Sequence, residues 1–146
     1  MGAAWIAFAN DPWRSRFEVL LDSAKLLRDQ GYHEAAIVTA QIACEVYTEI
    51  VLSAMFTRKD IEYLSDPVTK LLNNYNLGHN GVRRIYVAVC DDPIHEQPFW
   101  SRFKQHTERR NNVVHRGMQA DKSDADASVA VVEEVIQHIN SWFVNQ

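Results

Sequence analysis

The sequence predicts an all-α protein that forms a single domain over residues 1–146. Apolar residues recur at helical spacing through most of the chain, and glycines and prolines fall at the ends of these segments. The one β-branched run has no second strand with which it could pair. A chain of 146 residues can bury a substantial core as one domain, and no internal repeat or low-complexity linker divides it.

The first half of the chain contains two long helical segments. Asp11 is a predicted N-cap and Pro12 a favoured first-turn residue, and the apolar spacing that follows stops at Gly31, which predicts a helix over about residues 12–30. The segment from Tyr32 to Phe56 is apolar on nearly all sides. Such a helix is expected to lie among other helices, so we expect it to be central.

The middle of the chain predicts shorter elements. Residues 60–75 are expected to form one helix interrupted at Pro67 or two short ones, and the glycines and asparagines of residues 76–81 predict a loop. Residues 82–90 are rich in β-branched side chains. Because a lone strand would have no partner, we expect a helix there.

The last third predicts two helices with a sharp break between them. Two prolines within residues 93–98 mark a loop, and a helix is expected from residue 99 to about residue 116. Gly117 is a predicted C-terminal stop, and residues 124–143 are expected to form the last helix.

Composition limits the classes of function. The formal charge of −4 argues against a protein that grips nucleic acid with its whole surface. Cys44 and Cys90 lack the spacing of metal ligands, and the chain shows neither a leader peptide nor an apolar run long enough for a membrane span. We therefore expect a cytoplasmic protein without a membrane partner.

Residues 105–119, QHTERRNNVVHRGMQ, combine charged and apolar residues more densely than any other segment. At about 100° per residue, Arg110 falls in the same stripe as Phe103 and Val114, which is the apolar face of the predicted helix. An unpaired buried charge costs several kcal/mol. The Arg110 guanidinium is therefore expected to be paired, to line a wet cleft or to face a partner chain.

Asn111 and His115 are four residues apart and share the face beside that stripe. Histidine is the side chain best suited to proton transfer near neutral pH, and Asn111 is placed to orient it. Two interpretations stay open on spacing alone, because basic residues also gather at helix C-termini as caps. Glu45 is likewise either a polar residue at the edge of its helix or a partner that orients Arg110 across the bundle.

Basic side chains are concentrated around these residues despite the acidic total. Five of the 15 basic residues lie within one span of the sequence, and they predict a modest strip that attracts phosphate: Arg102, Lys104, Arg109, Arg110 and Arg116.

The segment RNNVVH, Arg110 to His115, resembles the Rx4-6H motif of HEPN domains, including the polar residue directly after the arginine. The context agrees, because a long alanine-rich helix with an embedded glutamate precedes the motif and an acidic-started helix follows it. The resemblance covers nearly the whole chain.

This resemblance implies an up-and-down bundle of four to five helices that forms a homodimer, with two copies of the motif in the cleft between subunits. Many such proteins are metal-independent endoribonucleases, often toxins of toxin-antitoxin systems or phage-defence effectors, and an antitoxin protein is then a further partner. Others are non-catalytic modules that bind nucleotides or a protein, and this alternative stays open. Neither a metal nor a cofactor is implied.

Roles follow from the resemblance and from the chemistry of the side chains. Arg110, His115 and Asn111 are the expected catalytic residues, because arginine pairs well with phosphate oxygens and histidine moves protons. Glu45 is expected to orient Arg110. The expected contacts to RNA or nucleotide come from three further residues: Arg109, Asn112 and Arg116.

Overall fold

The computed structural model describes residues 12–146, with side chains from residue 16 onward. This part of the chain contains helices and no strand, so the expected all-α fold class is confirmed. The predicted N-cap Asp11 lies outside the described residues. The α-helices are α1 (Pro12–Asp29), α2 (His33–Arg58), α3 (Ser65–Leu71), α4 (Asn80–Cys90), α5 (Trp100–Arg116) and α6 (Lys122–Val144), and two short 3-10 helices span Glu62–Leu64 and Ile94–Glu96.

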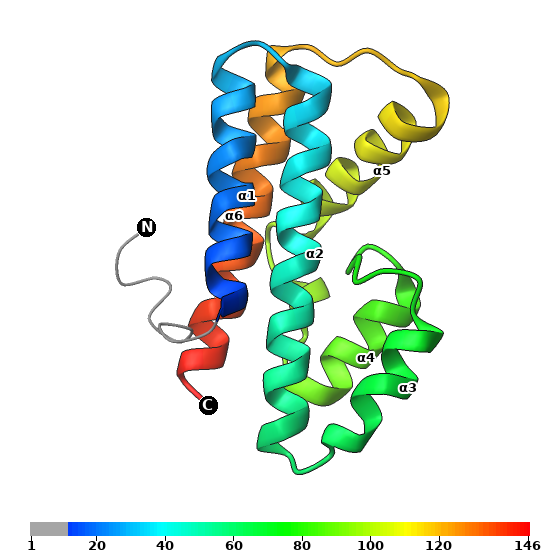
Figure 1. Cartoon of the computed structure of the whole chain (residues 1–146). Coiled ribbons are helices and arrows are strands. Elements are labelled where there is room, and N and C mark those ends of the chain that lie inside the picture. The colour runs from blue at the N-terminus through cyan, green and yellow to red at the C-terminus, as the bar shows by residue number, and fades with distance from the viewer. Residues whose placement is uncertain (1–11) are drawn as a thin grey trace.

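The long helices alternate in direction (Figure 1). α1 runs antiparallel to α2 and α6, which lie beside it, and α5 runs back toward the end of the molecule where α6 begins. α3 and α4 lie beside the C-terminal half of α2 (Figure 1). The bundle thus has six α-helices in its described part, because the short α3 and α4 add to the four long ones.

α2 is the central helix, as its composition predicted. It contacts α1, α4, α5 and α6. Its fully buried Tyr47 packs edge-on against Phe17 of α1, with ring centroids 4.5 Å apart, and donates a hydrogen bond of 2.8 Å to Asn140 Oδ1 of α6. Burying one such side chain contributes about 1.5–3 kcal/mol. This single residue therefore ties three helices together.

α2 is also long and apolar enough to span a membrane by length and composition, but 67% of its most apolar window is buried inside the protein. The core helix of a bundle passes the same test. Cys44 of α2 and Cys90 of α4 are free and buried, and burial raises the pKa of each thiol to about 12. Both are therefore protonated packing residues at neutral pH.

The segment over residues 60–75 differs from the expectation. Pro67 does not interrupt a helix but lies in the first turn of α3, where its missing N–H costs nothing. α3 ends at Leu71, and the loop that follows runs to His79, because Asn80 already begins α4. The expected helix over residues 82–90 is confirmed as part of α4.

α5 leaves the bundle along its length. Its buried residues, Phe103, His106 and Thr107, all lie in the first half of the helix, and Val114 is 46% exposed. The C-terminal half projects away from α2 (Figure 1). The apolar stripe predicted through Arg110 to Val114 therefore reaches solvent at its end, because the helix stays straight while the bundle ends.

The turn after α5 has the geometry that its sequence indicates. Gly117 adopts φ 62°, a left-handed conformation that favours glycine, and stops the helix as predicted. α6 then begins with a capping box, in which Asp121 Oδ1 accepts from the Asp124 N–H at 2.9 Å and the Asp121 N–H donates to the Asp124 carboxylate at 3.1 Å. These two signals fix where α5 ends and α6 begins.

Candidate functional site

Arg110 lies where the buried face of α5 emerges from the bundle. The side chain is half-buried, and one guanidinium nitrogen donates to Asn111 Oδ1 at 3.1 Å. Its Nε atom is buried and has no hydrogen-bond partner in the described residues. The half-buried guanidinium therefore carries a full charge at the edge of the core with one neutral hydrogen-bond partner, and it has further terminal N–H donors for an incoming anion.

Glu45 of α2 lies near Arg110 without forming an ion pair with it in the described residues. Burial raises the pKa of the Glu45 carboxyl, and the side chain of Gln41 and the positive charges of Arg110 and His79 oppose this rise. The direct pair expected across the bundle is therefore absent in the protomer. The positive charge of Arg110 reaches Glu45 through space and counteracts part of the effect of burial on that carboxyl.

A buried polar contact lies between α2 and α5, one helical turn before Arg110. The ring of His106 is fully buried, and its Nε2 donates to Gln41 Oε1 at 2.9 Å. Burial, followed by the charges of Arg109 and Arg110, lowers the pKa of His106 to about 3. His106 is thus neutral at physiological pH and adds no charge to the basic strip around it.

Asn111 lines an open cleft of about 330 Å³ between α5 and the loop that precedes α4. We call this space the loop cleft. Lys104 and Glu108 line it from α5, and Asn76 and His79 line it from the loop. Asn111 therefore lies beside both the Arg110 guanidinium and a space that can hold a small ligand.

His115 and Arg116 are exposed on the last turn of α5. His115 lies one turn beyond Asn111 on the same face of the helix. Arg116 directly precedes Gly117, so its charge lies beside the open carbonyls at the helix end. The sequence-predicted catalytic residues thus run from the edge of the core at Arg110 to the solvent at His115, with Asn111 and His115 on the face of α5 beside that of Arg110.

Arg109 and Asn112 lie on a different side of α5, which faces α6. Arg109 Nη1 donates to Ser128 Oγ at 2.7 Å, and its Nε lies 3.4 Å from Asp124 Oδ1. Arg109 and Asn112 line a second space of about 230 Å³ together with Val113 and Met118. The predicted substrate-binding residues are therefore divided, since Arg109 and Asn112 line this second space and Arg116 is exposed on the last turn of α5.

His79 is a residue that the sequence motif did not identify. It comes from a loop more than thirty residues before Arg110 in the chain, yet its charge acts on Glu45 together with that of Arg110. The one available signal was Gly78, which permits close approach of the loop to α5. A Cβ atom at Gly78 would come within 2.9 Å of Thr107 Cγ2.

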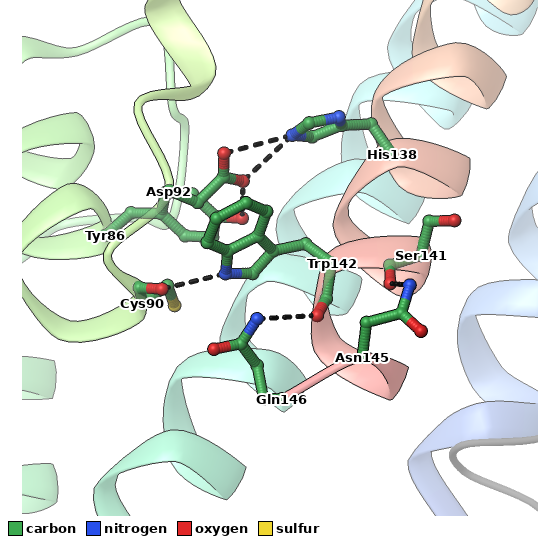
Figure 2. A network of polar contacts seen from close by, with 8 residues as sticks. All are labelled: Tyr86, Cys90, Asp92, His138, Ser141, Trp142, Asn145 and Gln146. Carbon is green, nitrogen blue, oxygen red and sulfur yellow. Dashed lines mark hydrogen bonds and ion pairs between the residues drawn. The ribbon is translucent and has the colours of Figure 1, made fainter.

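A second polar network lies at the other end of the bundle and includes a fully buried carboxylate (Figure 2). Asp92 accepts a hydrogen bond of 2.6 Å from Tyr86 Oη and one of 2.9 Å from His138 Nε2. Trp142 Nε1 donates to the Cys90 carbonyl at 2.8 Å. This network joins α4, the following loop and α6, and satisfies a charge that would otherwise be costly to bury.

The two aspartates before Pro93 therefore have separate roles. Asp91 ends α4 in a left-handed conformation, with φ 55°, and pairs with Lys59 at 3.2 Å. Among the described residues, no group of three or more histidine, cysteine, aspartate or glutamate side chains could hold a metal ion.

Comparison of the chain with protein-family models, with curated proteins and with solved structures finds no match.

Proposed function

We propose that this protein is a HEPN-like, metal-independent endoribonuclease that acts as a homodimer, with Arg110, Asn111 and His115 as its catalytic residues. The observation that carries the proposal is the half-buried Arg110 guanidinium, which bonds to the neutral Asn111 and forms no ion pair with an acid of the described residues. His115 is exposed on the next turn of the same helix. A phosphate is the natural partner for such a guanidinium, because its oxygens match the planar fork.

The chemistry requires only groups that α5 supplies. His115 takes the proton of the ribose 2′-OH, and the 2′ oxygen attacks the adjacent phosphorus. The bond from phosphorus to the 5′ oxygen breaks, and this oxygen takes up a proton from the partner subunit's His115. Arg110 stabilises the negative charge that builds on the phosphorane-like transition state, with Asn111 holding its guanidinium in place. The products are a 2′,3′-cyclic phosphate and a 5′-hydroxyl.

The exposed apolar residues at the end of α5 support a dimer. Val114, within the motif, is 46% exposed, and Met118, three residues after it, is 50% exposed. A two-fold contact places the same patch of both subunits together. Such a contact would cover these side chains and bring the two motifs to one cleft, where less water would surround each guanidinium.

The decisive experiment measures cleavage of mixed RNAs by the purified protein in excess EDTA. We expect fragments with 2′,3′-cyclic phosphate or 3′-phosphate ends, and no cleavage of an RNA with 2′-deoxyribose at the cut site. The free 2′-OH is the nucleophile, so its removal stops the reaction. Cleavage that requires added Mg²⁺, or an inert protein that still binds nucleotides, would reject the ribonuclease in favour of a non-catalytic nucleotide-binding module.

A further inference from the structure

The loop before α4 packs tightly against α5. Gly78 packs against Thr107 so closely that a Cβ atom there would lie 2.9 Å from Thr107 Cγ2. Lys104 Nζ donates to the Gly78 carbonyl at 2.8 Å, and Asn76 Oδ1 accepts from the Gly78 N–H at 2.8 Å. The loop therefore forms one fixed wall of the loop cleft, and α5 forms the other.

The groups in this cleft match one nucleotide. Lys104 uses one of its donors on the loop carbonyl and keeps two more for a phosphate. His79 is exposed, and the Asn111 amide can donate from the opposite wall. Glu108 is the one acid among the residues lining the cleft, and its carboxylate can accept hydrogen bonds from the amino group of a base.

The size and position of the cleft agree with this chemistry. Its volume of about 330 Å³ lies at the low end of the range for small-ligand sites, about 300–1,000 Å³. That is room for a single unstacked nucleotide and not for a duplex. Asn111 is shared by the cleft and by Arg110, so a nucleotide in the cleft would have the adjacent phosphate of the strand near the guanidinium.

We propose that the loop cleft binds one nucleotide of single-stranded RNA, beside the phosphate that Arg110 holds, and that Lys104 and His79 are its binding residues. The inference rests on the proposed function for the identity of the neighbouring phosphate. Lys104 neutralises the phosphate of the bound nucleotide, and His79 and Asn111 donate hydrogen bonds from the two walls. The cleft thus selects an unpaired stretch of RNA, because a base-paired nucleotide cannot enter it.

The test measures binding of a fluorescein-labelled 2′-O-methyl hexaribonucleotide, which lacks the free 2′-OH and cannot be cleaved, by fluorescence anisotropy. We expect Lys104→Met and His79→Ala each to weaken binding at least fivefold. Lys104→Met should also reduce the slope of log K against log salt by about 0.7, the value for one contact to a single-strand phosphate. Lys70→Met, which removes an exposed lysine on α3, should change neither quantity.

A matched pair of glycine variants tests the wall itself. Gly78→Ala should weaken binding because its Cβ pushes the loop away from Thr107, whereas Gly81→Ala places a Cβ where no atom lies within 4 Å and should bind normally. Circular dichroism and thermal unfolding identify any variant that fails to fold. If Gly78→Ala does not fold, the salt dependence of binding by Lys104→Met is the measurement that tests the cleft assignment.

The outcomes separate this inference from the proposed function. Unchanged affinity and salt slope in Lys104→Met, an RNA that does not bind, or equal affinity for inorganic phosphate and the oligonucleotide would overturn the cleft assignment. Cleavage of RNA at the wild-type rate by the Lys104→Met, His79→Ala double variant would leave the ribonuclease intact and reject the cleft. If the protein cuts no RNA but its binding of the oligonucleotide depends on Lys104, the cleft assignment holds and the ribonuclease is rejected.

Discussion

His106 Nε2 donates to Gln41 Oε1 at 2.9 Å, and this hydrogen bond joins α5 to α2 inside the core. The contact leaves His106 Nδ1 buried without a partner in the described residues, and the Nε of Arg110 is buried without one as well. Native proteins contain few such atoms. Both atoms belong to α5 and lie about one turn apart, where the helix leaves the core.

Replacing His106 by glutamine is expected to make stability less dependent on pH. Burial lowers the pKa of His106 to about 3, whereas the unfolded chain has a value of about 6.5. Between these values the unfolded state binds more protons, so wild-type stability falls as the pH falls, by about 1.4 kcal/mol per pH unit from this residue. Its contribution is complete above about pH 6.5.

Urea unfolding of both proteins between about pH 4.5 and 7.5 measures this effect. The free energy of unfolding of His106→Gln should fall less steeply on acidification, because glutamine does not titrate and can still donate to Gln41. Parallel curves for the two proteins would show that His106 takes up a proton without unfolding the chain.

Glu45→Gln is expected to stabilise the protomer at neutral pH. Burial raises the pKa of Glu45 despite the nearby positive charges of Arg110 and His79, so the folded state disfavours the carboxylate. As the pH falls, the folded state binds the proton before the unfolded state does. The free energy of unfolding of the wild type therefore increases as the pH falls through the raised pKa. The advantage of the variant should be largest at pH 7 and shrink on acidification; a variant less stable than wild type at pH 7 would point to a direct pair with Arg110.

Tyr86→Phe is expected to lower the free energy of unfolding by about 1–3 kcal/mol, because it leaves the buried Asp92 carboxylate with one donor fewer. Tyr86 Oη donates to Asp92 at 2.6 Å (Figure 2), and burial, followed by the hydrogen bond to Asp92, raises the pKa of the tyrosine. Tyr63→Phe is the matched control, since Tyr63 is 72% exposed. Equal stability of the two variants in urea unfolding would contradict this role of the network.

Arg110→Ala and His115→Ala are each expected to reduce RNA cleavage in EDTA by at least about 100-fold, because each removes a group that acts in the transition state. Asn111→Ala should have a smaller effect, since it removes only the neutral partner of Arg110. Arg84→Ala, an exposed arginine on α4, is the control for general charge. Initial rates on one labelled RNA measure all four, and a His115→Ala protein that cuts normally would refute the mechanism.

Val114→Asp is expected to convert a dimer into a monomer at micromolar concentration in sedimentation velocity. In an apolar two-fold contact the two introduced carboxylates lie close together. They repel each other, and each loses hydration, so the dimer is destabilised. Val19→Asp is the matched control, because Val19 is 61% exposed on α1 and lies away from the motif. A monomeric wild-type protein would reject the dimer, and dissociation by both variants would place the interface elsewhere.

Local signals were enough to predict most of the helices. The helical spacing of apolar residues, the glycine at position 117 and the apolar composition of residues 32–56 are each signals within one segment, and each led to a correct element. The segment over residues 60–75 was predicted less well, because a proline is compatible with both the start of a helix and its interruption.

The motif Arg110 to His115 could be found in the sequence because its residues lie on one helix. The sequence by itself thus determined that this protein is helical, that α2 is central and which residues of α5 form the candidate site.

Only the tertiary structure decided how far each side chain is buried and what it contacts. Glu45 and His79 come near Arg110 because α2 and the loop before α4 pack against α5, and Arg109 is paired with Asp124 because α6 lies on the other side. Burial and pairing depend on segments far apart in the chain, so they arise only when the helices pack.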